Sequence, residues 1–134
     1  MWLNAAVAAE AHAPAVLVVE DDAAVRLLLG AVFHGSPYRL VEARDGAGAL
    51  EAARRERPAV VLLDVGLPGD LDGFAVCRAI KADPELAGVA VVLLTARAED
   101  AHRQAGREAG ADAHLVKPFS PAALLELVAL LAGQ

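Results

Sequence analysis

The chain has 134 residues and a formal net charge of −6; 57% of its residues are hydrophobic and 22% are charged. This length fits one domain with a sizeable core, and the composition excludes a disordered chain. The acidic balance argues against direct binding to nucleic acid, which needs a basic surface. The single cysteine, Cys77, cannot form an internal disulfide, and no apolar stretch reaches the roughly 18 residues of a membrane span. We therefore expect a cytoplasmic protein that contacts neither nucleic acid nor a membrane.

Short apolar runs alternate along the chain with longer segments of helical period, a pattern that predicts βα units around a parallel sheet. Residues 1–14 are rich in alanine and are interpreted as a flexible leader, so the predicted domain covers residues 15–134. In chain order, the pattern predicts these strands and the helix that follows each: strand 15–19 and helix 23–34, strand 38–43 and helix 47–57, strand 59–63 and helix 74–82, strand 89–94 and helix 99–109, and strand 113–116 and helix 120–131.

Capping residues support several of these boundaries. Asp45 is a candidate N-cap for the second helix, and Ser120, which Pro121 follows, is one for the last helix. Gly110 is placed to end the fourth helix in the left-handed conformation. The second strand is short and more polar than the others, which favours a position at the edge of the sheet.

Five βα units with right-handed crossovers and one reversal predict the strand order 2-1-3-4-5. The expected fold is therefore α/β and flavodoxin-like, a doubly wound five-stranded parallel sheet with helices on both faces. In such sheets, ligands bind outside the carboxyl ends of the strands, at the point where the strand order reverses. Here that point lies between the first and the third strand.

Polar side chains follow four of the five predicted strands, directly at the carboxyl end of each. Because these ends share one edge of the sheet, we expect acids, a hydroxyl and an ammonium group to converge there. Crowded carboxylates repel one another unless a cation lies between them, and oxygen ligands suit Mg²⁺ or Mn²⁺. The residues at the four strand ends are Glu20-Asp21-Asp22, Asp64, Thr95-Ala96 and Lys117-Pro118.

Asp21 and Asp64 are the expected metal ligands, together with the backbone carbonyl of Gly66 and with Glu20 or Asp22 in a supporting role. The sequence leaves open whether Asp22 supports the metal or only caps the helix at 23–34. The second carboxylate oxygen of Asp64 would remain free to attack a phosphoryl group.

Three further groups would stabilise the charge on a transferred phosphoryl group. We expect the Lys117 ammonium to contact one oxygen, and the Thr95 hydroxyl with the Ala96 N–H to contact another. Ala96 is also small, which leaves space for an incoming phosphodonor.

These motifs resemble the receiver domain of two-component response regulators, and the resemblance covers about residues 16–131. It implies a phosphorylation-dependent signalling switch, in which Asp64 accepts a phosphoryl group from a histidine kinase or a phosphotransfer protein. It also implies that Asp21 is the principal metal ligand, that Thr95 is the switch hydroxyl and that Lys117 contacts the phosphate. The motifs that carry the resemblance are Val18-Val19-Glu20-Asp21-Asp22, Asp64 with Leu67-Pro68 and Asp72-Gly73, Leu94-Thr95-Ala96, and Lys117-Pro118-Phe119, with a cis peptide bond expected before Pro118.

The resemblance further implies a domain that loses its phosphate by slow self-dephosphorylation and is not an enzyme. A downstream protein would bind the face of the fourth helix, the fifth strand and the fifth helix, and a homodimer is left open. Two features depart from the family pattern. The loop from Asp64 to Gly73 is one residue longer, and His114 stands three residues before the lysine, where the family usually has a Tyr or Phe. The resemblance implies that this ring is a switch residue with Thr95 and rotates inward on phosphorylation, and a histidine makes it titratable.

Two other functions fit part of the pattern. A Mg²⁺-dependent phosphatase with an aspartyl nucleophile would need a second acid two residues after Asp64, where this chain has Gly66. A docking module that is never phosphorylated would not need Asp21, Asp64, Thr95 and Lys117 together. The remaining polar residues have ordinary explanations: Cys77 is expected in the core, His12, His34 and His102 are expected in solvent, and Arg103 with Arg107 is expected on a solvated helix face.

Overall fold

The computed structural model describes residues 13–96 and 100–133. Five parallel strands form one sheet in the order β2-β1-β3-β4-β5, which confirms the predicted topology. Strand β2 lies at one edge, as its polar sequence predicted. The strands are β1 (Ala15–Val19), β2 (Arg39–Ala43), β3 (Val60–Asp64), β4 (Ala90–Thr95) and β5 (Ala113–Val116).

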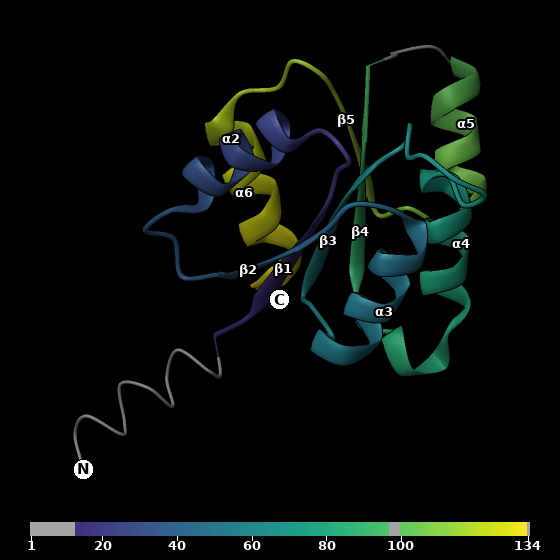
Figure 1. Cartoon of the computed structure of the whole chain (residues 1–134), viewed down its shortest axis with the longest axis horizontal. Coiled ribbons are helices and arrows are strands. Elements are labelled where there is room, and N and C mark those ends of the chain that lie inside the picture. Colours follow the sequence, from purple (N-terminus) through teal and green to yellow (C-terminus); the bar gives the residue numbers. More distant parts are fainter. Residues whose placement is uncertain (1–12, 97–99, 134) are drawn as a thin grey trace.

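Helices cover both faces of the sheet (Figure 1). Helices α2 and α6 pack on one face, and α3, α4 and α5 pack on the other. The helices are α2 (Ala23–Phe33), α3 (Gly46–Glu56), α4 (Gly73–Ala82), α5 (Asp100–Glu108) and α6 (Pro121–Ala132), with a short 3-10 helix η1 (Pro84–Leu86) before β4.

The predicted elements agree with these bounds to within one or two residues, apart from two points. The 3-10 helix η1 was not predicted. Asp83 caps it by accepting a hydrogen bond from the Glu85 N–H. The predicted start of the fourth helix at residue 99, and most of the predicted leader, lie outside the described residues.

The three central strands are buried on both faces, which explains why they read as unbroken apolar runs. Alternate side chains enter the two cores: Leu17 and Val61 face α3 and α4, whereas Val16 and Val60 face α2 and α6. Cys77 belongs to the core between the sheet and helices α3 and α4, as predicted, and burial raises the pKa of its thiol to about 11. Within the described residues, no helix has both the length and the apolar character needed to cross a bilayer.

Side-chain caps fix where four helices begin, and three of them were predicted. The carboxylate of Asp22 accepts hydrogen bonds from the N–H groups of Ala24 (2.8 Å) and Val25 (3.4 Å). Asp45 and Ser120 cap α3 and α6, and Asp72 caps α4. Each cap satisfies backbone donors that the first turn of a helix leaves free. The starts of α2 and α4 are thereby fixed next to the carboxyl ends of β1 and β3.

Candidate functional site

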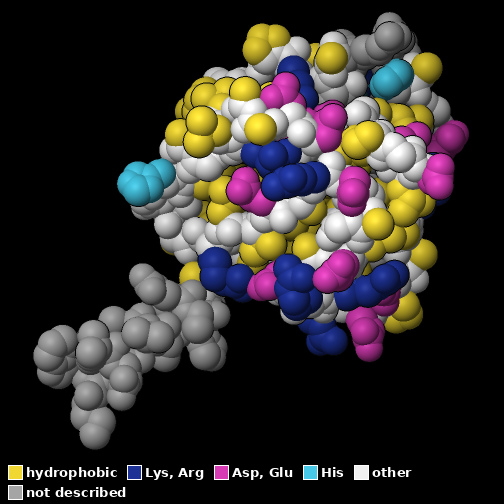
Figure 2. All heavy atoms as spheres, in the orientation of Figure 1, with side chains coloured by type: hydrophobic (Ala, Val, Ile, Leu, Met, Phe, Trp, Pro, Cys, Tyr) yellow, Lys and Arg dark blue, Asp and Glu magenta, His cyan; other side chains and the backbone are white. Residues whose placement is uncertain are grey.

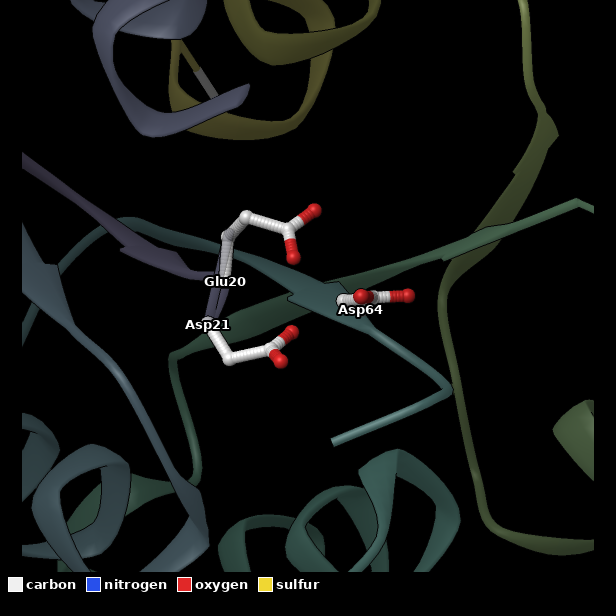
Figure 3. Close-up of side chains that lie close together, drawn as sticks. All are labelled: Glu20, Asp21 and Asp64. Atoms are coloured by element: carbon white, nitrogen blue, oxygen red, sulfur yellow. The ribbon is translucent and has the colours of Figure 1, made fainter. Parts of the chain in front are cut away.

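Three carboxylates meet at the carboxyl ends of the adjacent strands β1 and β3 (Figure 3). Glu20 and Asp21 directly follow β1, Asp64 is the last residue of β3, and one carboxylate oxygen from each lies within 4.8 Å of the others. The pairing of Val19 with Leu63 sets this proximity, because it brings the two strand ends level. Glu20 is buried, Asp64 is partly buried and Asp21 is exposed, so the cluster opens to solvent on the Asp21 side.

The loop after Asp64 is shaped by close backbone contacts. The Gly66 N–H donates a hydrogen bond of 3.2 Å to Oδ1 of Asp64, and the Gly73 N–H donates one of 3.0 Å to the Val65 carbonyl. A Cβ atom at Gly73 would overlap the carbonyl oxygen of Asp64 and lie 2.6 Å from Cα of Val65. Glycine is therefore required at position 73 for the loop to return against the end of β3. Within the loop, Gly69 adopts a left-handed φ of 90°.

Lys117 brings a positive charge to the three acids. Its Nζ lies 3.0 Å from Oε1 of Glu20 and 3.7 Å from Oδ1 of Asp64. The Lys117 N–H donates a 2.7 Å hydrogen bond to the Thr95 carbonyl, which holds the end of β5 against β4. The cis peptide bond between Lys117 and Pro118 is present, as expected. Lys117 therefore offsets part of the cost of burying Glu20.

Thr95 and Ala96 complete this edge of the sheet. Thr95 is the last residue of β4 and is buried, whereas Ala96 is exposed. Both line a hollow of about 280 Å³ together with Asp64 and Lys117. The structure thus brings the predicted acceptor, hydroxyl and ammonium groups around one space.

The cluster suits a divalent cation. Three carboxylates beside one ammonium leave two negative charges uncompensated, which a divalent cation would balance. The donors are oxygen atoms, as Mg²⁺ and Mn²⁺ prefer. Asp21 and Asp64, with Glu20 beside them, would hold the ion.

Asp22 lies outside this cluster. Its carboxylate turns back to cap α2 and is not one of the three that lie together. The prediction that Asp22 caps this helix is therefore confirmed. Its backbone N–H donates a 3.3 Å hydrogen bond to Oε2 of Glu20, so Asp22 supports the cluster through its main chain.

Two residues near the site were not predicted from the sequence. The Arg26 guanidinium donates a 2.7 Å hydrogen bond to the Glu20 backbone carbonyl, which connects α2 to the segment of Glu20 and Asp21 after β1. His102 was expected in solvent, but this expectation is wrong. Its ring is partly buried, packs edge-on against Phe74 with centroids 5.8 Å apart, and lines the hollow beside Asp64. No local sequence pattern signals either contact, because each depends on how a helix packs on the sheet.

His114 lies on β5 and is partly buried. Its Nε2 is buried without a hydrogen-bond partner among the described residues. Burial lowers the pKa of this imidazole, and the charges of Arg103 and His102 lower it further. His114 also lines a groove of about 340 Å³ between α5 and β5, together with Arg103, Arg107 and Asp112.

Known proteins with this sequence pattern are response regulators. The DNA-binding response regulator MtrA of Mycobacterium tuberculosis is 42% identical over 113 residues, which are 84% of this chain and 48% of MtrA. The transcriptional regulatory protein AfsQ1 of Streptomyces coelicolor is 41% identical over 105 residues, which are 78% of this chain and 45% of AfsQ1. The chain therefore spans about half the length of these relatives.

Solved structures agree with this match. The receiver domain of the sensor histidine kinase PA1611 from Pseudomonas aeruginosa, solved with a magnesium ion in its active-site cleft, has a TM-score of 0.82 and 31% identity, over 90% of this chain and 98% of that one. The BeF3-activated receiver domain of RstA from Klebsiella pneumoniae has a TM-score of 0.81 and 33% identity, over 90% of this chain and 99% of that one. Because the response regulator receiver domain pattern also matches residues 16–129, this chain belongs to the response regulator receiver domain family of two-component signalling systems.

Proposed function

We propose that Asp64 accepts a phosphoryl group from a histidine kinase or a phosphotransfer protein in a reaction that requires Mg²⁺. The observation that carries this proposal is the placement of Asp64 within 4.8 Å of Glu20 and Asp21 and 3.7 Å from the Lys117 ammonium. Membership of the receiver domain family supports it. The protein would act in the cytoplasm as a phosphoacceptor and not as an enzyme.

In the proposed step, a carboxylate oxygen of Asp64 attacks the phosphorus atom of a phosphohistidine. The new P–O bond forms as the P–N bond breaks, and the electron pair of that bond stays on the donor imidazole, which takes a proton from solvent. When bound, Mg²⁺ would neutralise charge on the carboxylates and on the transferred group. Lys117 and Thr95 line the hollow beside Asp64, where they would contact the phosphoryl oxygens.

The phosphorylated domain would signal through the face of α5, β5 and α6. The groove of Arg103, Arg107 and His114 lies on this face. Helix α5 borders both spaces, because Arg103 lines the groove and the preceding residue, His102, lines the hollow beside Asp64. We propose that a downstream protein, or a second copy of this chain, binds there. The chain has a formal net charge of −6, so we do not propose that this domain contacts nucleic acid. The one face seen in Figure 2 mixes basic and acidic side chains.

Intact-mass measurement after incubation with acetyl phosphate tests the proposal. We expect one added phosphate with Mg²⁺, none in the presence of a chelator, and none for Asp64→Asn. Asp70→Asn is the matched control, since Asp70 is an exposed acid of the same loop that is not part of the cluster. Absence of the added phosphate in the unmodified protein would instead favour the docking-module hypothesis. Continuous release of phosphate from external phosphoesters would favour the phosphatase hypothesis.

A further inference from the structure

His102 is the large side chain that α5 contributes to the hollow beside Asp64. The described residues that line this hollow are Asp64, Val65, Gly66, Thr95, Ala96, His102 and Lys117. All of them except His102 lie at or directly after the carboxyl end of a strand. His102 thus enters the acceptor site from a different layer of the fold.

The strand-end residues leave the hollow open on one side. A Cβ atom at Gly66 would meet no heavy atom within 4 Å, so Gly66 borders open space. Ala96 offers only a methyl group and is exposed. Neither residue can restrict what reaches the acceptor carboxylate, whereas an imidazole in the same lining can.

The His102 ring is held in position by packing. It lies edge-on to Phe74 of α4, with an interplanar angle of 68°, a favourable geometry for aromatic rings. Its Nδ1 is buried and has no hydrogen-bond partner among the described residues. The orientation of the ring therefore rests on its contact with Phe74.

We propose that His102 controls access to Asp64 and sets the lifetime of the phosphorylated state by restricting the approach of water. This inference rests on the proposed phosphorylation of Asp64. In hydrolysis, a water oxygen attacks the phosphorus atom and the P–O bond to Asp64 breaks. The electron pair returns to the carboxylate, and the water loses a proton to solvent. The attacking water must enter in line with the breaking bond, so a bulky ring in the lining of the hollow narrows the approach and slows this step.

Two substitutions distinguish the effect of the ring's bulk from the effect of its nitrogen atoms. His102→Phe keeps a planar ring that can pack on Phe74 but removes both nitrogen atoms, whereas His102→Ala removes the ring. Glu108→Ala is the matched control, because Glu108 is an exposed residue of the same helix that lines neither this hollow nor the groove beside β5. Each protein is phosphorylated with acetyl phosphate and Mg²⁺ and then desalted, and loss of the phosphate is followed by intact mass. Thermal unfolding checks that each variant is folded.

We expect His102→Ala to shorten the lifetime about three- to tenfold, while His102→Phe and Glu108→Ala stay within about twofold of the unmodified chain. An unchanged lifetime in His102→Ala overturns the proposal. A lifetime in His102→Phe as short as that in His102→Ala also overturns it, because the nitrogen atoms and not the ring would then matter. If the unmodified chain gains no phosphate at all, the proposed function fails and this inference fails with it. If the unmodified chain and His102→Ala both gain phosphate and lose it at the same rate, the role of His102 is rejected while the proposed phosphorylation of Asp64 stands.

Discussion

The ammonium of Lys117 lies 3.0 Å from the carboxylate of Glu20, a side chain that is only 2% exposed. These residues are 97 positions apart in sequence and come from opposite ends of the chain. Their contact links the three-acid cluster to the stability of the fold, because a buried carboxylate without a partner is strongly unfavourable. The positive charge of Lys117 is therefore expected to contribute to the free energy of unfolding when no metal is bound.

Lys117→Ala tests this coupling. Removing the ammonium leaves Glu20 buried beside two other acids, so we expect the free energy of unfolding to fall by about 1–3 kcal/mol without Mg²⁺. Saturating Mg²⁺ should recover part of the loss, since the ion supplies positive charge to the same acids. Metal binding should persist, whereas phosphorylation or its structural response should be impaired. Urea unfolding with and without Mg²⁺ measures the stability, and acetyl phosphate labelling measures the acceptor function.

Lys81→Ala is the matched control for this experiment. It removes a 2.9 Å ion pair with Asp112 that is more exposed and lies away from the three acids. Its effect on stability should not depend on Mg²⁺. If Mg²⁺ changes the stability of both variants by the same amount, Lys117 is not coupled to the metal site.

The adjacent acids Asp21 and Asp22 should have separable functions. Asp21→Ala removes a member of the three-acid cluster and is expected to weaken Mg²⁺ binding strongly, with little change in the stability of the metal-free protein. Asp22→Ala removes the cap of α2 and should cost about 0.5–2 kcal/mol of stability with only a small effect on Mg²⁺ affinity. Titration calorimetry and urea unfolding of both variants decide the matter. Equal losses of Mg²⁺ affinity would show that the inner ligand is misassigned.

Gly73→Ala should damage both the fold and the acceptor site. The added Cβ would overlap the Asp64 carbonyl, and the loop must shift to relieve this, at a cost of about 1–3 kcal/mol. Because the strained atoms belong to the acceptor residue, phosphorylation by acetyl phosphate should slow as well. Gly88→Ala is the control, since a Cβ there meets nothing within 4 Å. If Gly73→Ala is as stable and as readily phosphorylated as Gly88→Ala, the loop does not constrain Asp64.

The sheet was predictable because its signal is local. Buried parallel strands need apolar residues on both faces, so each of β1, β3 and β4 is visible as a continuous run in the sequence. The strand order followed from the rules for crossover connections, and the meeting of Asp21 with Asp64 followed from the strand order. These conclusions required no knowledge of side-chain packing.

The contacts between layers were not predictable in the same way. The sequence left Asp22 with two possible functions, and the hydrogen bonds to Ala24 and Val25 that establish its capping function could not be read from it. His102 was placed in solvent, because the polar sequence of α5 does not show which side faces Phe74. Gly73 was visible as part of a motif, but its close approach to the Asp64 carbonyl depends on how the loop returns.

His114 should make both stability and signalling depend on pH. Burial lowers the pKa of this imidazole below its ordinary value of about 6.5, and Arg103 and His102 add to the effect. The unfolded chain then binds a proton at higher pH than the folded chain does. His114 therefore costs nothing above the unfolded pKa and destabilises the protein as the pH falls from about 6.5 towards the lower folded value. Relative to His114→Phe, the unmodified chain should lose stability over this range.

The same titration bears on the proposed switch. If the ring moves further inward when Asp64 is phosphorylated, desolvation disfavours its charged form still more, and the active state loses population at low pH. The charged and titratable groups around the ring are Arg103, His102 and Arg107 on α5 and Asp112 before β5, and Asp112 is the one acid among these four. Binding of a partner, or NMR shifts of a phosphate-mimic complex, should be compared at pH 6 and pH 8 for the unmodified chain and His114→Phe. We expect a loss at pH 6 in the unmodified chain alone, and the same pH response in both proteins would exclude His114 as its source.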